Sequence, residues 1–256
     1  MTATVTDFDI AIRLGEVARE ILIPRATAAD FGVRTKDDGS PVTDADLACE
    51  RAMRGLLAEL VPSDAVWGEE LGQETGARCW VLDPIDGTKA FASGSPLFCS
   101  LAGLVADGSF AAGVIEVPML RQRWAAGGGQ GVVAGPDGER PLAGLASAKE
   151  KLAEASVAVT APLRHPRGAE LCAQAAFTRY GGDAYNFACV ASGRLDIALD
   201  EGLQPHDFTA LLPVLAHAGA CCSDFSGRPP VPGQPSDLIA AGSASLLEQA
   251  LKILAG

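Results

Sequence analysis

The sequence predicts a layered α/β sandwich, and two features of its hydrophobic pattern support this prediction. Two amphipathic helical segments come first, and four closely spaced strands suited to antiparallel pairing follow them. After residue 150 the pattern changes to strands that alternate with helices, which is typical of a sheet with helices packed on it. We therefore divide the chain into an N-terminal α+β half, residues 1–140, and a C-terminal α/β half, residues 141–256, joined in one compact unit.

Length, charge and cysteine pattern narrow the classes of function. The chain has 256 residues and a formal net charge of −12. This acidity argues against nucleic acid or an anionic membrane as a partner. The N-terminus lacks the basic start and apolar core of a signal peptide, and no apolar run is long enough to span a bilayer. The seven cysteines show no CxxC and no zinc-type spacing, so we expect unpaired thiols and a cytoplasmic protein.

Two helices are predicted in the N-terminal half. Apolar residues at helical spacing place the first over residues 7–23, and Pro24 should end or kink it. The second begins at Thr43, which can cap it together with Asp46 at the third position, and continues to Pro62. The other expected elements are a mobile polar loop at 35–42, a short strand at 65–67, a central strand at 79–82, and antiparallel strands at 97–105, 110–117, 121–126 and 131–134.

The C-terminal half follows a loose connection over residues 135–150. The glycines at 127–129 precede no helical pattern, so we interpret them as a hairpin turn and not as a phosphate loop. The expected elements, in order, are a strand at 156–160, helices at about 167–178 and 184–192, a strand at 195–199, a helix at 207–218, strands at 220–225 and 237–241, and a helix at 243–254.

The segment WVLDPIDGT, residues 80–88, carries the strongest signal of chemistry. Its apolar run ends in Asp83, and Pro84 should stop the strand because proline cannot donate to a sheet. Asp83 and Asp86 can then point into one small volume, where two unscreened carboxylates would repel each other. Mg²⁺ removes that repulsion because it prefers carboxylate oxygen. Gly87 and Thr88 follow where a helix can begin, which is a favourable place for a phosphate.

Other acidic residues lie where a strand or turn meets a helix. Glu69 and Glu70 follow a strand, Asp46 lies in the first turn of a helix, and Asp207 begins another helix. Each of the two helix-starting aspartates, taken alone, is better explained by interaction with the helix dipole, worth roughly 0.3–1 kcal/mol. Their combination with the DPIDGT segment is what suggests a shared site.

Together the motifs resemble those of the inositol monophosphatase superfamily, in the same order and at similar spacings. They are Lys36, Val42-Thr43-Asp44-Ala45-Asp46, Gly68-Glu69-Glu70, Asp83-Pro84-Ile85-Asp86-Gly87-Thr88, and Asp207 followed by Ala210. The resemblance implies a layered αβαβα fold, a commonly homodimeric assembly, and Mg²⁺-dependent, lithium-sensitive hydrolysis of a small phosphorylated metabolite. Two or three Mg²⁺ ions would activate the attacking water, so no protein nucleophile is required.

The resemblance also implies roles for individual residues. The metal ligands would be Glu69, Asp83, the carbonyl of Ile85, Asp86 and Asp207. The carboxylate of Glu70 would not bind a metal directly but would lie next to these ligands. Glu69 and Thr88 would orient and help deprotonate the attacking water, and Asp46 would hold a water molecule of the metal cluster. Asp86 and the backbone amides of Gly87 and Thr88 would face the phosphate, Asp200 would contact the substrate, and Lys36 would lie on a mobile loop that closes over the metals.

One residue departs from the family pattern. Trp usually precedes the final metal-binding aspartate, whereas this chain has His206 before Asp207. The change puts the packing beneath the ligand in question, but not the ligand itself. His206 could contact the substrate or pack in place of the indole, and the packing role is the one we favour.

Three stretches resemble the histidinol-phosphate phosphatase branch, whose members act in histidine biosynthesis. They cover residues 87–98, 182–187 and 203–214. The substrate histidinol phosphate carries an ammonium group, and we expect some of four carboxylates to face it: Asp183, Asp196, Asp200 and Glu201. Asp200 could equally accept hydrogen bonds from inositol, so inositol 1-phosphate or another small phosphate ester remains the alternative substrate.

Three other interpretations of the acidic motifs do not fit the sequence. A haloacid-dehalogenase phosphatase has its two aspartates two residues apart, whereas Asp83 and Asp86 are three apart. An EF-hand loop that starts at Asp83 would need a bidentate Glu at position twelve, which is Gly94. A degenerate member of the family that serves only as a binding scaffold should have lost a ligand, and none is lost.

Overall fold

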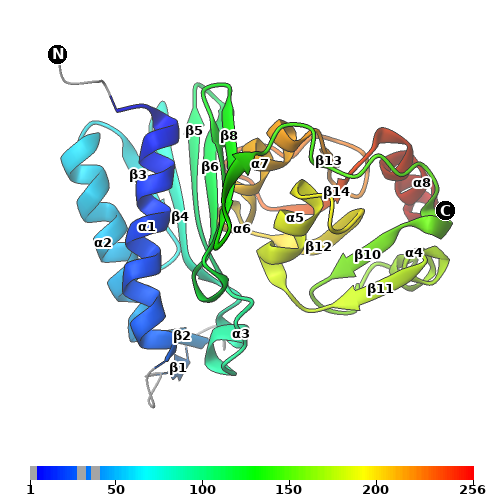
Figure 1. Ribbon diagram of the computed structural model, residues 1–256, viewed down its shortest axis with the longest axis horizontal. Helices are drawn as coiled ribbons and strands as arrows, with labels where there is room; N and C mark the ends of the chain where they lie inside the picture. Colours follow the sequence, from blue (N-terminus) through cyan, green and yellow to red (C-terminus); the bar gives the residue numbers. More distant parts are fainter. Residues whose placement is uncertain (1–4, 28–32, 36–40) are drawn as a thin grey trace.

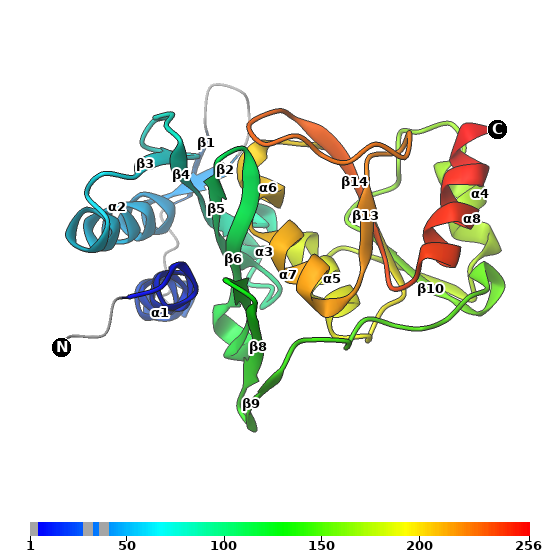
Figure 2. The same ribbon diagram turned by 90° about the horizontal axis from the view of Figure 1, so that it is seen from above.

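Helices and sheets alternate in the order αβαβα across the molecule, as Figure 2 shows from above. The computed structural model describes residues 5–27, 33–35 and 41–256. The first large sheet takes its strands from residues 65–141 and the second from residues 156–241. This arrangement confirms the predicted layered sandwich, while the division of the chain at residue 140 stays a prediction.

Two long helices form the outer layer at the N-terminal side. They are α1 (Asp7–Ala26) and α2 (Asp44–Leu60), which pack on each other and on the first sheet (Figure 1). Each begins with a capping box, Thr6 with Asp9 in α1 and Thr43 with Asp46 in α2. The cap predicted at Thr43 is therefore confirmed. The first helix continues through Pro24 for two more residues.

The first large sheet has seven strands in sequence order. They are β3 (Ala65–Gly68), β4 (Arg78–Asp86), β5 (Cys99–Ala106), β6 (Ser109–Val117), β7 (Gln122–Gly127), β8 (Gln130–Gly135) and β9 (Gly138–Pro141). Only β3 and β4 pair in parallel; the other neighbours are antiparallel. Gly128 and Gly129 both have positive φ, as a two-residue hairpin turn requires. This confirms a turn rather than a phosphate loop at the glycines.

The middle layer lies between the two sheets (Figure 2). It consists of α5 (Asp183–Ala191), α6 (Pro205–Phe208) and α7 (Leu211–Ala218), and α3 (Thr88–Ala92) follows the end of β4. Apolar side chains of these helices, such as Phe187, Phe208 and Leu215, are buried in one cluster with residues of both sheets. This layer fixes the position of the two sheets relative to each other.

The second large sheet and two more helices complete the sandwich. In spatial order the strands are β11 (Phe177–Tyr180), β10 (Ser156–Val159), β12 (Ile197–Leu203), β14 (Ser236–Ala241) and β13 (Cys221–Ser223); the outer helices are α4 (Gly168–Gln174) and α8 (Ala244–Ala255). The first three strands are parallel to one another, and β14 is antiparallel to its two neighbours. Within the described residues, no helix is both long and apolar enough to cross a bilayer.

The prediction that β4 stops at Pro84 is wrong. The strand continues to Asp86, and its register against β5 shifts: Asp83 pairs with Leu101, but Asp86 pairs with Cys99. The three-residue step on β4 therefore matches a two-residue step on its partner, which is a bulge. Proline is tolerated there because the ladder is already interrupted.

Other predicted segments also differ from the structure, and the helix predicted over 207–218 is divided into α6 and α7. The helix predicted over 167–178 ends at Gln174, and its tail forms β11, because Phe177, Thr178 and Tyr180 favour an extended backbone. The connection over 135–150 contains the short strand β9. The ends of the loop predicted at 35–42 belong to β1 (Val33–Thr35) and β2 (Pro41–Thr43), which pair with each other; residues 36–40 lie outside the described part of the chain.

Candidate active site

The bulge at the end of β4 brings two carboxylates toward the middle layer. Asp83 is only 2 % exposed, and its Oδ1 atom is buried without a hydrogen-bond partner among the described residues. Asp86 accepts a hydrogen bond of 2.8 Å from the backbone N–H of Ala184, at the start of α5. The irregular strand end thus connects the first sheet to a helix of the C-terminal half.

Helix α2 contributes two buried acidic groups from one face. Asp46 caps the helix: its Oδ2 accepts hydrogen bonds from the backbone N–H and the hydroxyl of Thr43, at 2.7 and 2.6 Å. Its Oδ1 is buried without a partner. Glu50 lies one turn later and is fully buried.

Glu50 holds the segment that follows β3. Its carboxylate accepts hydrogen bonds from the backbone N–H groups of Glu70 and Leu71, at 2.8 and 3.1 Å, and from Nε of Arg54 at 2.8 Å. A Cβ on Gly68 would come within 1.7 Å of this carboxylate, so glycine is required there. These contacts fix the backbone on both sides of Glu69.

The N-terminus of α6 positions Asp207. Its Oδ2 accepts a hydrogen bond of 2.7 Å from the backbone N–H of Gln204, which completes a capping box. The preceding His206 is partly buried, and its Nε2 lies 3.3 Å from Oδ1 of Asp207. The Nδ1 atom of His206 is buried without a hydrogen-bond partner within the described structure.

These elements bring two sets of possible metal-binding atoms together. In one set, a ring nitrogen of His206 and carboxylate oxygens of Glu69 and Asp83 all lie within 4.8 Å of one another. In the other set, carboxylate oxygens of Asp83, Asp86 and Asp207 lie equally close. Asp83 belongs to both sets, so it is placed to bridge two cations.

The carboxylates destabilise each other's charge. Burial, followed by the charges of Glu69 and Asp86, raises the pKa of Asp83 well above its usual value. Burial and the neighbouring Asp183 do the same to the pKa of Asp86. Burial also raises the pKa of Asp46 and of Asp207, although the charge of His206 opposes the latter shift. In the absence of metal, such a cluster takes up protons more readily than exposed carboxylates do, and a bound cation would neutralise it in their place.

The donor set fits Mg²⁺. The atoms of the second set are all carboxylate oxygens, which are the ligands that this ion prefers. The buried, unpartnered oxygens of Asp83 and Asp46 supply acceptor capacity that no described protein group uses. A divalent cation would satisfy these oxygens and offset the repulsion between the carboxylates.

A small cavity of about 180 Å³ adjoins the acidic cluster on the side of the C-terminal half. Four carboxylates line it, those of Asp86, Asp183, Asp200 and Asp207. Asp200 accepts a hydrogen bond of 2.6 Å from the hydroxyl of Thr160, and burial raises its pKa to about 6. The cavity therefore offers two acidic groups beyond those of the possible metal sets.

Gly87 occupies a position that admits no side chain. Its φ of +82° is in the left-handed region, and a Cβ would come within 2.9 Å of Oδ2 of Asp183. Asp183 itself has a φ of +44°, and burial raises its pKa. The DGT turn and the start of α5 are thus in close contact.

The structure brings most of the predicted site residues together. Asp46, Glu69, Asp83, Asp86 and Asp207 form the acidic cluster, with Asp200 in the adjoining cavity. The hydroxyl of Thr88 donates a hydrogen bond of 3.1 Å to the carbonyl of Ile85, and Gly87 lies between them. The backbone of Glu70 is held by Glu50, and Lys36 lies outside the described residues.

Two of the four carboxylates expected near an ammonium group lie elsewhere. Asp196 accepts hydrogen bonds from Ser147, Lys149 and Ser156 at the other end of β12. Glu201 accepts hydrogen bonds from the backbone of Arg164 and His165. Of the four, only Asp183 and Asp200 line the cavity: Asp196 lies at the opposite end of β12, and Glu201 follows Asp200 directly, so it points to the other face of the strand.

Sequence reasoning missed two residues. The role of Glu50 as a backbone clamp has a signal in the sequence, since it lies four residues after Asp46 and shares its helix face. His206 was expected to pack, but the structure places its ring beside Glu69 and Asp83. Its departure from the family pattern was the available signal.

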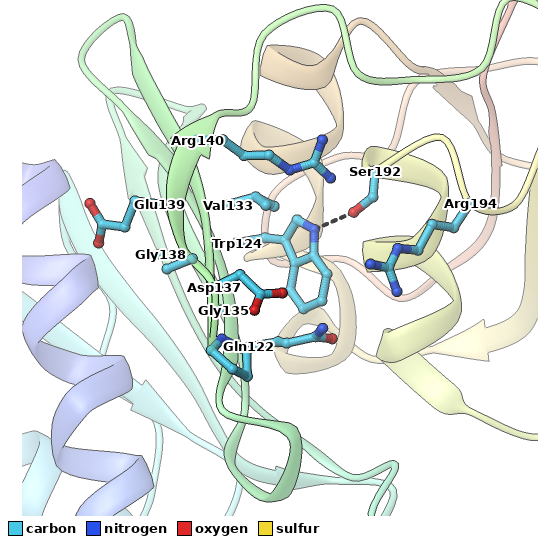
Figure 3. Close-up of a pocket in the computed structure, with 12 residues that line it drawn as sticks. Gln122, Trp124, Val133, Gly135, Asp137, Gly138, Glu139, Arg140, Ser192 and Arg194 are labelled. Atoms are coloured by element: carbon cyan, nitrogen blue, oxygen red, sulfur yellow. Dashed lines mark hydrogen bonds between the residues drawn. The ribbon is translucent and has the colours of Figure 1, made fainter.

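A second pocket, of about 200 Å³, is separate from this cluster (Figure 3). Trp124, Arg140 and Arg194 line it, and Nε1 of Trp124 donates a hydrogen bond to the hydroxyl of Ser192. None of the residues that line this pocket belongs to the acidic cluster.

Comparisons with known proteins show what the chain as a whole is similar to. The chain matches the sequence profile of the inositol monophosphatase family over residues 2–255. A histidinol-phosphatase of Mycobacterium tuberculosis is 36 % identical over 229 residues, which cover 86 % of this chain and 88 % of that protein. A probable inositol 1-monophosphatase of the same organism is 31 % identical over 235 residues, covering 88 % and 86 %. An inositol monophosphatase structure from Zymomonas mobilis shares 32 % identity with a TM-score of 0.86, covering 100 % of both chains.

Proposed function

The chain belongs to the inositol monophosphatase family, and we propose that within it the protein is a Mg²⁺-dependent phosphatase that hydrolyses histidinol phosphate. The observation that carries the proposal is the acidic cavity beside the two sets of possible metal ligands. That cavity offers the carboxylates of Asp183 and Asp200 to a substrate bound at the metals.

The proposed metal ligands are Glu69, Asp83, Asp86 and Asp207, with the carbonyl of Ile85 in addition. The shared position of Asp83 supports at least two ions. When bound, Mg²⁺ would neutralise phosphate charge and lower the pKa of a coordinated water molecule. Asp46, whose Oδ1 is buried without a partner, would hold another water molecule of the cluster.

The chain's own residues would orient the reactants. The hydroxyl of Thr88 would help to orient the attacking water, and the carboxylate of Glu69 would accept its proton. The phosphate would lie near the start of α3, at the turn where Gly87 is required because a side chain would collide with Asp183. Because Gly87 has no Cβ, its backbone amide could approach the phosphate closely, and the amide of Thr88 would follow it in the same turn.

The proposed choice of substrate depends on charge. Histidinol phosphate carries an ammonium group, and an ionised Asp183 or Asp200 would pair with it in a cavity that is partly shielded from solvent. Such a charge-assisted hydrogen bond contributes roughly 1.5–3 kcal/mol, or about ten- to a hundredfold in selectivity. A bisphosphate would be repelled by the same carboxylates.

Inositol 1-phosphate is the alternative substrate. The relative described as a probable inositol 1-monophosphatase is 31 % identical to this chain, only slightly less than the histidinol-phosphatase. Asp200 could accept hydrogen bonds from the hydroxyl groups of inositol, but a neutral ring gains less than an ammonium group from two carboxylates.

Metal dependence is tested by phosphate release from L-histidinol phosphate. The chelator-treated protein should release none, and added Mg²⁺ should restore turnover in a saturable manner. Addition of Li⁺ should then inhibit, as we propose by family resemblance. Full activity in excess chelator would contradict the multi-metal proposal.

We also propose a homodimer that works in the cytoplasm. Strand β11 is the edge of its sheet, and Phe177 and Tyr180 on it are 57 % and 56 % exposed, which a second copy could cover. All seven cysteines are free, as a reducing compartment favours. Light scattering should give twice the monomer mass, and a monomer mass at every concentration would refute the dimer.

A further inference from the structure

We propose that His206 is itself a metal ligand, which makes one of the two metal positions a mixed nitrogen–oxygen site that prefers Mn²⁺ or a related transition-metal ion over Mg²⁺. This inference rests on the proposed metal-dependent function and specifies the metals. The other position keeps three carboxylates and remains suited to Mg²⁺.

The spacing of the side-chain atoms of His206, Glu69 and Asp83 suits the binding of one metal ion. A ring nitrogen of His206 lies within 4.8 Å of carboxylate oxygens of both Glu69 and Asp83. Two ligands on opposite sides of one ion are separated by roughly 4.2 Å, twice a metal–nitrogen distance of about 2.1 Å. A small inward movement of these side chains would therefore close the three atoms around a cation.

Two buried polar atoms without hydrogen-bond partners among the described residues also support His206 as a metal ligand. Asp83 is 2 % exposed, and its Oδ1 has no hydrogen-bond partner among the described residues. The Nδ1 atom of His206 is likewise buried and unpartnered. Buried polar groups of this kind are nearly always satisfied in folded proteins, so each calls for an explanation. One cation would satisfy both.

A packing role accounts less well for His206. If His206 only filled the space of the usual tryptophan, its ring would lie among apolar side chains. Its two nitrogens would then have hydrogen-bond partners. Here the ring lies among three carboxylates, and its Nε2 is 3.3 Å from Oδ1 of Asp207. A metal-binding histidine commonly has its second nitrogen beside a carboxylate, which orients the ring.

The nitrogen ligand determines the metal preference. Mg²⁺ favours oxygen ligands almost exclusively, whereas imidazole nitrogen raises the affinity for transition-metal ions along the Irving–Williams series. Because Asp83 belongs to both sets, the two ions would share one carboxylate. The expected state is therefore a mixed pair, with a transition-metal ion beside His206, for which Mn²⁺ serves as the probe, and Mg²⁺ beside Asp86.

Pulsed electron paramagnetic resonance on the tag-free, chelator-treated chain tests the proposal without substrate or turnover. With one equivalent of Mn²⁺, the wild-type protein should show hyperfine coupling to a ¹⁴N nucleus. His206→Gln and His206→Trp should abolish this coupling. The chain has three histidines, and His165→Gln is the matched control because its ring packs on Phe225, outside the acidic cluster.

Calorimetric titrations provide the second readout. In His206→Gln the dissociation constant for Mn²⁺ should rise by about ten- to a hundredfold, and that for Mg²⁺ by less than about threefold. Absence of ¹⁴N coupling in the wild type, or equal losses for both ions, would overturn the inference. If both ions bind without nitrogen coupling, only this inference fails; if neither ion binds, the proposed metal-dependent function fails as well.

Discussion

Among single residues, Asp83 is the one that both sets of possible metal ligands share. Its position at the irregular end of β4 explains why the carboxylate is almost completely buried and yet has an oxygen that no described group satisfies. Removal of its charge should therefore affect metal binding more than folding. The neighbouring carboxylates would repel each other less once this charge is gone.

We predict that Asp83→Asn lowers turnover by more than about 100-fold, because a direct ligand should matter more than the groups that merely orient ligands. Calorimetry should show that one of the Mg²⁺ sites is lost, while circular dichroism shows a folded chain. Asp137→Asn, an exposed change between β8 and β9, is the control. Retention of normal turnover by Asp83→Asn would contradict the bridging role.

Asp200 is the residue that should distinguish substrates. We predict that Asp200→Asn lowers kcat/KM for histidinol phosphate by about ten- to a hundredfold, because the substituted amide cannot pair with an ammonium group as a charge. An aryl phosphate, which has no cationic group, should lose less than about threefold. Equal losses on both substrates would show that Asp200 acts on the metals or the fold, and not on the leaving group.

At the scale of elements, the site depends on four helix beginnings and two strand ends. The starts of α2, α3, α5 and α6 carry Asp46, Thr88, Asp183 and Asp207, and the ends of β3 and β4 carry Glu69, Asp83 and Asp86. Helix N-termini are partly positive, so they favour both these carboxylates and an incoming phosphate. This common polarity explains why capping residues and site residues coincide.

The clamp formed by Glu50 gives a prediction at this scale. We predict that Glu50→Gln destabilises the protein by about 2 kcal/mol, because the amide nitrogen would face a backbone N–H that now donates to a carboxylate. Mg²⁺ affinity should fall at the same time, since the backbone beside Glu69 is no longer held. Denaturant unfolding and calorimetry measure the two effects. Glu59→Gln, exposed on the same helix, should change neither.

The sequence predicted those parts of the site that depend on local rules. The capping box of α2 and the hairpin glycines follow from the backbone needs of one turn, and both are present. The continuation of β4 past Pro84 depends on how β5 pairs with it, which a single segment does not encode. The same holds for β11, whose extended form is stabilised by parallel pairing with β10.

Residues that meet across the fold were the hardest to predict. That Asp183 and Asp200 line the cavity while Asp196 and Glu201 do not depends on the end and the face of β12 that each residue occupies and on the packing of α5. The position of His206 beside Glu69 joins residues from the two halves of the chain. Spacing along the sequence carries little information on such contacts.

At the scale of the whole molecule, the buried carboxylates couple folding to pH and metal. The pKa values of Asp46, Asp83, Asp86, Asp183, Asp200 and Asp207 are all raised in the folded protein, that of Asp200 to about 6. The folded state thus binds more protons than the unfolded chain between about pH 4 and pH 7. The stability of the metal-free protein must then rise as the pH falls through this window.

We predict that the melting temperature of the chelator-treated protein is a few degrees higher at pH 5 than at pH 7.5. Mg²⁺ should raise the melting temperature most at pH 7.5, because the buried carboxylates then carry few protons and a bound cation neutralises their charge. The aspartates with lowered pKa, such as Asp196 and Asp224, lose their stabilising effect only below about pH 4 and do not alter this trend. Scanning calorimetry that shows lower stability at pH 5 would contradict the prediction.

The central claim is that a metal-dependent phosphatase site is combined with an acidic cavity that selects a cationic leaving group. The most direct test compares kcat/KM for L-histidinol phosphate and inositol 1-phosphate at pH 7.5 with saturating Mg²⁺. We predict at least about a tenfold advantage for histidinol phosphate, in line with one charge-assisted hydrogen bond. A tenfold advantage for inositol 1-phosphate would contradict the substrate assignment, and hydrolysis of neither would contradict the account as a whole.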